Sequence, residues 1–95
     1  MKQYYKFINV FEKDGITEKE DTSGMPYSEF KGLIMEEVLP TEVGKKMMMN
    51  TVDRTLIDGY FRTSTVENTL VNGKQMTVVT RNTIYKFEII NTYEG

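Results

Sequence analysis

Apolar residues, most of them aromatic or β-branched, recur with polar residues between them through residues 3–12 and 60–90, a pattern that is typical of β-strands. Within residues 3–12, apolar side chains fall on both faces, which predicts a strand covered on two sides. They are Tyr5, Phe7 and Phe11 on one face, and Tyr4, Ile8 and Val10 on the other. Asp14-Gly15 follows as a hairpin signal, and the charged residues 16–21 are expected to form the returning edge strand.

The middle of the chain has helical spacing instead. Pro26 can open a helix, and Pro40 ends it near Val38, because the residue before a proline avoids helical backbone angles. Five apolar residues recur at helical spacing: Tyr27, Phe30, Leu33, Ile34 and Val38. Residues 41–57 leave two alternatives open, a second helix capped by Thr41, or a short helix followed by a strand from about Met48.

The last third predicts a three-stranded meander. Residues 60–70 and 74–80 read as strands joined by Asn72-Gly73, the strongest hairpin turn in the chain, and residues 83–90 read as a third strand. The sequence therefore predicts an α+β domain with an N-terminal β-hairpin, one or two central helices and a C-terminal antiparallel β-meander.

A polar run, Thr80-Arg81-Asn82-Thr83, interrupts the apolar pattern near the C-terminus. One uninterrupted strand through this run would mix apolar and polar residues on one of its faces. A turn or bulge at Arg81-Asn82 resets the alternation, and asparagine tolerates the backbone angles of such a turn. We therefore expect a turn or bulge, to which a ligand-binding role of Arg81 would be an addition.

Length and composition indicate a single globular domain, residues 1–95. Apolar residues make up 39% and charged residues 27%, which is typical of a water-soluble domain. There is no apolar run long enough to span a membrane, and the first residues lack the features of a signal peptide. Because no cysteine is present, no disulfide can form, and we expect a cytoplasmic protein.

The residue types limit the available chemistry. The chain has no histidine and no cysteine, which removes the usual general base, thiolate catalysis and a typical zinc site. Carboxylates, hydroxyls, lysines and arginines remain, and none of them forms a recognisable catalytic pair. We expect a protein that is not an enzyme and that uses neither a cofactor nor a metal.

Charge is distributed unevenly along the chain. Residues 1–44 hold five basic and nine acidic side chains, giving −4, and residues 45–95 hold seven basic and five acidic ones, giving +2. The simpler interpretation is ordinary scatter on a solvated surface; the alternative is a bipolar surface for head-to-tail self-association, or an anion site in the second half. The overall charge of −2 argues against a nucleic-acid-binding protein.

All three arginines lie in the second half of the chain, and arginine suits bidentate capture of phosphate or carboxylate. The candidate ligand-binding residues are Arg54, Arg62, Thr63, Ser64, Arg81, Asn82 and Thr83, helped by Lys45 and Lys46. If their strands are neighbours, these donors can line one site for a nucleotide or other small phosphorylated ligand. The alternative is that they are ordinary exposed strand residues.

Three consecutive methionines, Met47, Met48 and Met49, cannot all face one core in either a helix or a strand. At least one must therefore lie on the surface. Together with Lys45 and Lys46, they are a candidate interface for self-association or partner binding. The simpler alternative is that two pack inside and one is incidentally exposed.

The last third also resembles a known group of proteins. Thr63-Ser64-Thr65-Val66, followed by Thr80-Arg81-Asn82-Thr83-Ile84-Tyr85-Lys86-Phe87, is similar to a pattern in small proteins of low-GC Gram-positive bacteria and their phages. The resemblance implies a β-rich C-terminal unit in a phage or mobile-element setting, and it carries no activity across.

These expectations together favour a non-catalytic binding module that associates with itself as a homo-oligomer. In the phage setting, its partner would be a host protein, for example a defence or transcription component. The second hypothesis is sequestration of a small phosphorylated messenger.

Overall fold

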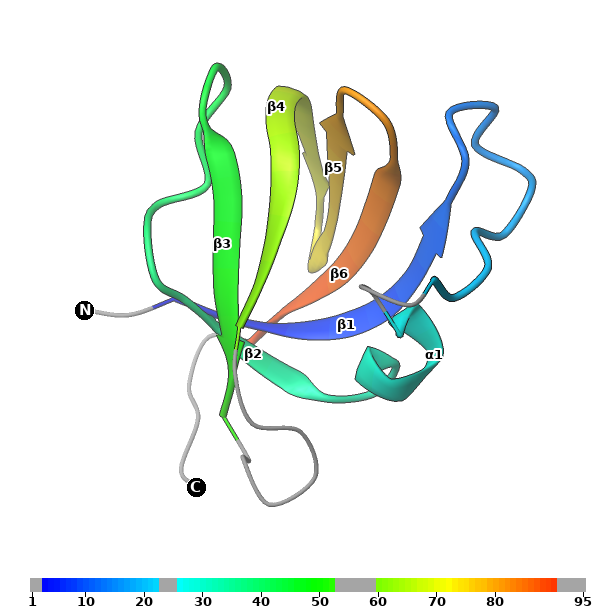
Figure 1. The fold of residues 1–95 in the computed structure, drawn as a ribbon. Coiled ribbons are helices and arrows are strands. Elements are labelled where there is room, and N and C mark those ends of the chain that lie inside the picture. The colour runs from blue at the N-terminus through cyan, green and yellow to red at the C-terminus, as the bar shows by residue number, and fades with distance from the viewer. Residues whose placement is uncertain (1–2, 23–25, 53–59, 91–95) are drawn as a thin grey trace.

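The computed structural model describes residues 3–22, 26–52 and 60–90, which form a six-stranded antiparallel β-barrel (Figure 1). Each strand pairs with the next along the chain, and β6 returns to pair with β1 and close the barrel. The elements are β1 (Tyr4–Phe11), α1 (Tyr27–Phe30), β2 (Ile34–Glu37), β3 (Lys46–Thr51), β4 (Tyr60–Asn72), β5 (Gln75–Thr80) and β6 (Ile84–Ile90).

The predicted α+β class is therefore wrong, and the predicted helix over residues 26–38 is the main reason. Only one helical turn, α1, forms there, and the chain leaves it at Lys31, whose ψ is 128°. Gly32 follows with φ +82°, and its amide donates to the Phe7 carbonyl at 2.7 Å. Phe7 in turn donates to the carbonyl of Leu33 at 2.9 Å, so pairing with β1 overrides the helical spacing.

Two further expectations need correction. In residues 41–57, the described part contains a strand, β3, instead of a helix, so the alternative with a strand from about Met48 is nearer to the structure. Residues 16–21 do not form a returning strand, because only a single bridge, between Phe11 and Glu18, joins this segment to β1. The partners of β1 are β2 and β6.

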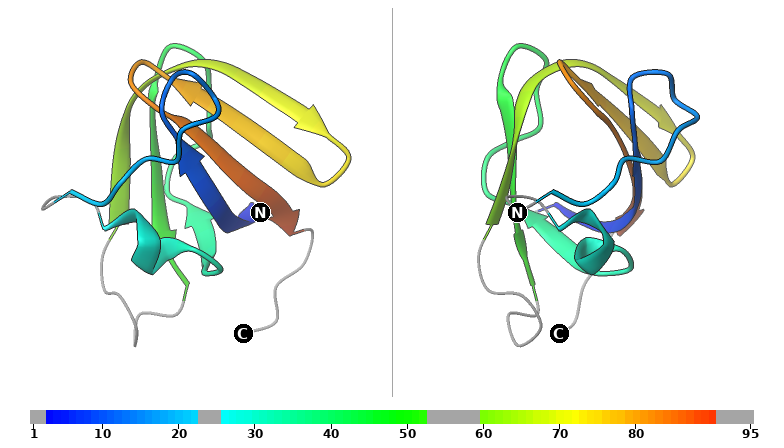
Figure 2. Two further views of the ribbon diagram at one scale, coloured as in Figure 1. Left: turned by 90° about the vertical axis from the view of Figure 1, so that its right-hand side faces the viewer. Right: turned by 45° about the vertical axis from the view of Figure 1, so that its right-hand side comes forward.

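The predicted C-terminal meander is confirmed. Strands β4, β5 and β6 pair in chain order, and Asn72 lies opposite Gln75, so the first turn is Gly73-Lys74, one residue later than predicted. Arg81 and Asn82 form the second turn, which is held by hydrogen bonds of 2.8 Å and 2.9 Å from the amide and hydroxyl of Thr80 to the carbonyl of Thr83. Figure 2 shows the β4–β5 hairpin, drawn in yellow, extending away from the rest of the barrel.

The core consists of side chains that point into the barrel from alternate strand positions. Phe7 lies at its centre, with its ring edge-on to Phe87 at a centroid distance of 5.6 Å and to Tyr85 at 6.3 Å. From α1, Phe30 adds a further contact with the ring of Phe7 at 5.9 Å. The short helix thus covers one side of the barrel next to β1, as Figure 1 shows.

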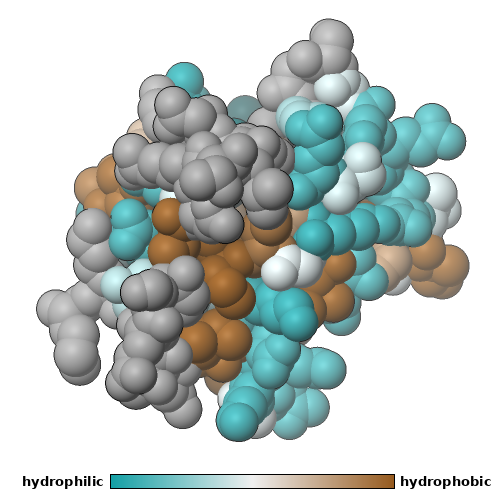
Figure 3. Space-filling view, turned by 90° about the horizontal axis from the view of Figure 1, so that it is seen from below, coloured by the Kyte–Doolittle hydropathy of each residue, from teal (hydrophilic) through white to brown (hydrophobic). Residues whose placement is uncertain are grey.

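Seen from below, hydrophobic side chains reach the surface between hydrophilic ones (Figure 3). In the part of the chain that the structure describes, no helix combines the length and the apolar character needed to cross a membrane.

Candidate functional site

The inside of the barrel is filled with side chains. The largest fully buried ones are Phe7, Phe87, Met35, Met47, Met49, Val10, Val66, Val78, Thr51 and Thr80. Even barrels of about eight strands are only just wide enough to hold side chains or one small ligand, and this barrel has fewer strands. A binding site is therefore expected on the outer surface.

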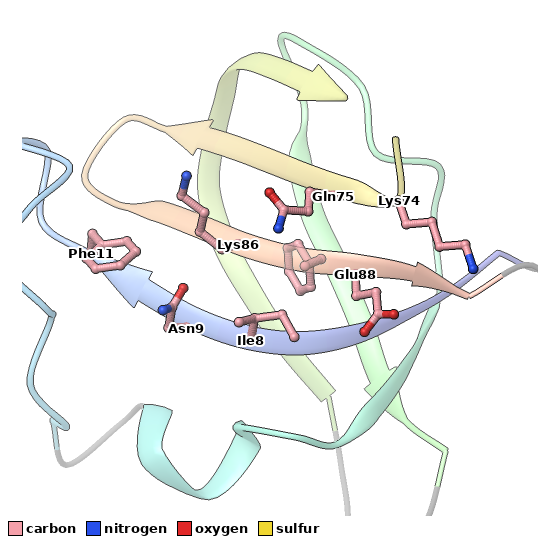
Figure 4. A pocket seen from close by; sticks show the side chains of 8 residues that line it. Ile8, Asn9, Phe11, Lys74, Gln75, Lys86 and Glu88 are labelled. Carbon is pink, nitrogen blue, oxygen red and sulfur yellow. The ribbon is translucent and has the colours of Figure 1, made fainter. Parts of the chain in front are cut away.

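A groove of about 500 Å³ lies on the outer face of β1, β5 and β6 (Figure 4). This volume falls in the range of about 300–1,000 Å³ that is usual for ligand pockets. The lining residues are Ile8, Asn9 and Phe11 from β1, Lys74 and Gln75 from the beginning of the β5 region, and Lys86, Phe87 and Glu88 from β6.

The shape of the groove follows from a bulge in β1. The register between β1 and β6 shifts between Phe7 and Asn9, which adds one residue to this strand. Strict alternation from Phe7 would turn Asn9 inward, but Val10 takes the next interior position and is fully buried. Ile8 and Asn9 therefore both line the groove, and β1 curves strongly at this point (Figure 1).

The charges of the groove are unbalanced. Glu88 is the one acidic side chain among the described residues of the lining, and it lies directly opposite Lys6 of β1 in the sheet register. Within the described residues, Lys74 and Lys86 form no ion pair. The groove thus offers two ammonium groups beside the apolar side chains of Ile8 and Phe11, on a chain whose overall charge is −2.

Asn9 adds an unused hydrogen-bonding group to the wall of the groove. Its Oδ1 atom is buried and has no hydrogen-bond partner among the described residues. Buried polar atoms are normally paired, and leaving one unpaired costs about 1–3 kcal/mol. Rotation of the side chain toward the groove would allow this acceptor to take a hydrogen bond from a ligand.

A second hollow, of about 490 Å³, lies between the segment after β1 and α1. Its polar groups bind one another: Asp21 accepts hydrogen bonds from the amide and hydroxyl of Ser28, and Lys31 pairs with Glu18. The bonds from Ser28 lower the pKa of Asp21. Among the described residues, no group of three metal-binding side chains occurs. This hollow is a structural junction.

Two tyrosines are the titratable groups most affected by the barrel. Burial raises the pKa of Tyr85 far above its ordinary value, helped by its neighbour Tyr27. Burial also raises the pKa of Tyr5, with a further contribution from the carboxylate of Glu37. Both hydroxyls therefore remain neutral at physiological pH, and neither is suited to act as a base.

The arginines expected to form an anion site are not gathered by the strands. Arg62 is exposed on β4 opposite Met48, whereas Arg81 lies in the β5–β6 turn, where its amide donates to the Thr65 carbonyl at 2.9 Å. Arg62 lies three positions before Thr65 along β4, which is a separation of roughly 10 Å. Arg54 lies outside the described residues.

The hydroxyl groups expected beside these arginines are mostly engaged elsewhere. Thr63 is buried, and its hydroxyl accepts from the Met47 amide at 3.2 Å and donates to the Ser64 carbonyl at 2.7 Å. Thr83 is also buried, and its hydroxyl accepts from the ammonium of Lys19 at 2.7 Å. These two threonines therefore stabilise the barrel. Ser64 is half-buried and Asn82 is exposed.

The three methionines divide as a strand requires. Met47 and Met49 are fully buried inside the barrel, and only Met48 faces outward. Lys45 and Lys46 are exposed, and the ammonium of Lys45 lies 3.0 Å from the carboxylate of Glu42. Of the expected interface, Met48 and the two lysines remain available to a partner.

The residues of the groove were missed by sequence reasoning. The sequence places Phe7 and Phe11 on one face of the strand and Val10 on the other. The bulge after Phe7 reverses this, so that Val10 is buried with Phe7 and Phe11 lines the groove. Lys86 and Glu88 looked like ordinary solvent-facing positions, since the pairing of β6 with β1 brings together residues far apart in the sequence.

The protein is a small antiparallel barrel with a filled interior and an external groove. Comparison with protein-family models, with curated proteins and with solved structures gives no match for this chain.

Proposed function

We propose that this protein is a non-catalytic binding module whose groove on β1, β5 and β6 receives a segment of a partner protein. The observation that carries the proposal is the combination of Lys74 and Lys86, neither in an ion pair within the described residues, with apolar Ile8 and Phe11 in one groove. The lack of histidine and cysteine in the whole chain supports a role in binding.

The lining determines the chemistry of the bound segment. An apolar side chain of the partner would pack on Ile8 and Phe11, while one or two carboxylates would face Lys74 and Lys86. The amide of Asn9 would bond to the backbone or to a polar side chain of the segment. The partner is thus an acidic segment with a central apolar anchor.

The biological setting belongs to the same proposal. The resemblance to small proteins of Gram-positive bacteria and their phages supports an accessory protein that binds a host macromolecule, such as a defence component. Stoichiometric binding suits a small domain that lacks the usual catalytic residues. The absence of cysteine supports action in the cytoplasm.

Selection from a displayed library of random twelve-residue peptides tests this proposal, because it requires no assumption about which protein is the partner. We expect the enriched peptides to combine acidic residues with one large apolar residue. Binding of synthetic versions should weaken about tenfold or more in Lys86→Glu, because reversal of one charge next to a carboxylate replaces attraction with repulsion.

Arg62→Glu is the matched control, because Arg62 is exposed and lies outside the groove. It changes the net charge by the same amount, so it should leave peptide affinity within about twofold. Equal losses in the two variants, or a library that yields no binding peptide, would rule out the groove as the binding surface.

A small phosphorylated ligand is the second candidate, favoured by the same two ammonium groups of Lys74 and Lys86. A ligand at a hundredfold excess over its Kd stabilises the folded state by about 2.7 kcal/mol. A thermal-shift screen with nucleotides and cyclic nucleotides tests it, and the shift should disappear in Lys86→Glu. If none of these compounds raises the melting temperature, the phosphorylated-ligand hypothesis is rejected and only the peptide proposal remains.

A further inference from the structure

The second half of β4 is an open sheet edge. Strand β3 pairs with β4 only as far as Thr65, and hydrogen bonds of 2.8 Å each join Val66 to Gly44 and Lys45. From Glu67 to Asn72, β4 pairs with β5 on one side, and no strand of the described residues pairs with the other side. In both views of Figure 2, this part of β4 is the outermost strand.

The backbone groups on this edge can be assigned from the hairpin register. Asn72 and Gln75 close a two-residue turn, so they form a hydrogen-bonded pair, and bonding then alternates along the hairpin. Thr69 and Val71 consequently direct their amides and carbonyls outward. The Thr69 amide accordingly bonds to the side-chain oxygen of Asn68 at 2.9 Å instead of to β5.

The side chains of this edge do little to block a further strand. Natural edges usually carry charges or prolines in their central positions. Here the central residues are uncharged, and Leu70 and Val71 are 57% and 62% exposed. Charges occur only at the two ends, with Glu67 before the segment and Lys74 after it.

The sequence of the edge is nearly symmetric about Leu70. On either side of Leu70 lie two β-branched residues, Thr69 and Val71, and beyond them two asparagines, Asn68 and Asn72. In an antiparallel copy, Glu67 at one end faces the Gly73-Lys74 end of the other strand. Self-pairing centred on Leu70 therefore places Thr69 opposite Val71 of the partner, and both present outward backbone groups. It also brings Glu67 of each strand, which already pairs with Lys13, near the Gly73-Lys74 end of the other.

We propose that residues Glu67–Asn72 of β4 pair antiparallel with the same residues of a second copy, forming a two-fold symmetric dimer with Leu70 facing Leu70 on its axis. The symmetric sequence of the edge favours a second copy over an unrelated strand. None of residues 67–72 lines the groove on β1, β5 and β6, which the edge approaches only at Lys74, so this inference does not depend on the proposed function.

A single cysteine at the axis tests the geometry directly, since the chain contains no other cysteine. In a non-hydrogen-bonded antiparallel pair the two Cα atoms lie about 4.5 Å apart, which permits a disulfide. We expect Leu70→Cys to form a disulfide-linked dimer at least about tenfold faster than Val43→Cys, an equally exposed control on a loop. Equal rates would overturn the proposal.

Charged variants at position 70 test the same dimer without disulfide formation. Leu70→Lys and Leu70→Glu should each be monomeric by sedimentation velocity, because like charges meet on the axis, whereas an equimolar mixture should form a heterodimer. Circular dichroism confirms that each variant remains folded. The proposal would be overturned if the wild-type protein is monomeric at every concentration measured, or if either Leu70 variant by itself is still a dimer.

Discussion

The ammonium of Lys13 lies 2.7 Å from the carboxylate of Glu67 and also donates to the Thr80 carbonyl at 2.9 Å. It thereby joins the segment after β1 to β4 and β5. Glu67 is the extra residue where the β4–β5 register shifts between Val66 and Asn68. The contact therefore fixes the bulge at which β4 leaves the barrel and its open edge begins.

Replacement of Lys13 by methionine should lower the free energy of unfolding by only about 0.5 kcal/mol, because both side chains remain partly exposed to water. Urea denaturation of Lys13→Met, Glu67→Gln and the double variant measures the coupling between the two residues. Additive effects of the two single changes would show that the ion pair contributes nothing.

Substitution of Gly32 by alanine is expected to change the stability in opposite directions in the barrel and in the predicted helix. In the barrel its φ is +82°, a conformation that costs alanine about 1 kcal/mol, although no atom would clash with the added methyl group. In a continuous helix the same change would instead stabilise by about 1 kcal/mol. We expect Gly32→Ala to lower the urea midpoint, with the exposed Glu29→Ala as control.

Phe7 tests the aromatic centre of the core. It is completely buried against Phe87 and Tyr85, so Phe7→Ala should cost about 3–5 kcal/mol, a large share of the stability of a small domain. The adjacent Ile8 is 40% exposed, and Ile8→Ala should cost about 0.5 kcal/mol or less. Similar losses at both positions would contradict the assigned strand faces.

Alkaline titration tests the burial of Tyr5 and Tyr85. Their pKa values are raised in the folded protein, so folding stabilises their neutral forms. This stability is complete below the ordinary tyrosine pKa of about 10 and is lost as the pH rises above it, because only the unfolded chain then ionises. Absorbance at alkaline pH should show both hydroxyls titrating together with unfolding. Their ionisation in the folded protein would contradict the structure.

The two ends of the fold could be predicted from the sequence because their patterns are local. Strand β1 and the β4–β6 meander are rich in aromatic and β-branched residues, and Asn72-Gly73 predicts a turn that the structure has one residue later, at Gly73-Lys74. The middle could not, since Tyr27, Phe30 and Leu33 have helical spacing that arises from one turn followed by a strand. The long-range bonds of Gly32 and Leu33 to Phe7 decide between these structures, and no local pattern contains them.

The candidate site was less accessible to prediction than the fold. Arg62 and Arg81 attracted attention by their residue type, but a functional site depends on which strands are neighbours. The groove arises from closure of the barrel between β1 and β6 and from the bulge after Phe7. In the sequence, Asn9 and Lys86 look like ordinary strand residues. Only the β1–β6 pairing and the bulge bring them into one groove.

The central claim is that the groove on β1, β5 and β6 is the binding surface, and an NMR titration with a selected acidic peptide tests it most directly. We expect the largest changes in amide chemical shift at groove positions such as Ile8, Asn9 and Lys86, with Arg62 and Arg81 nearly unchanged. Changes centred on the two arginines, or on the open edge of β4, would contradict this account.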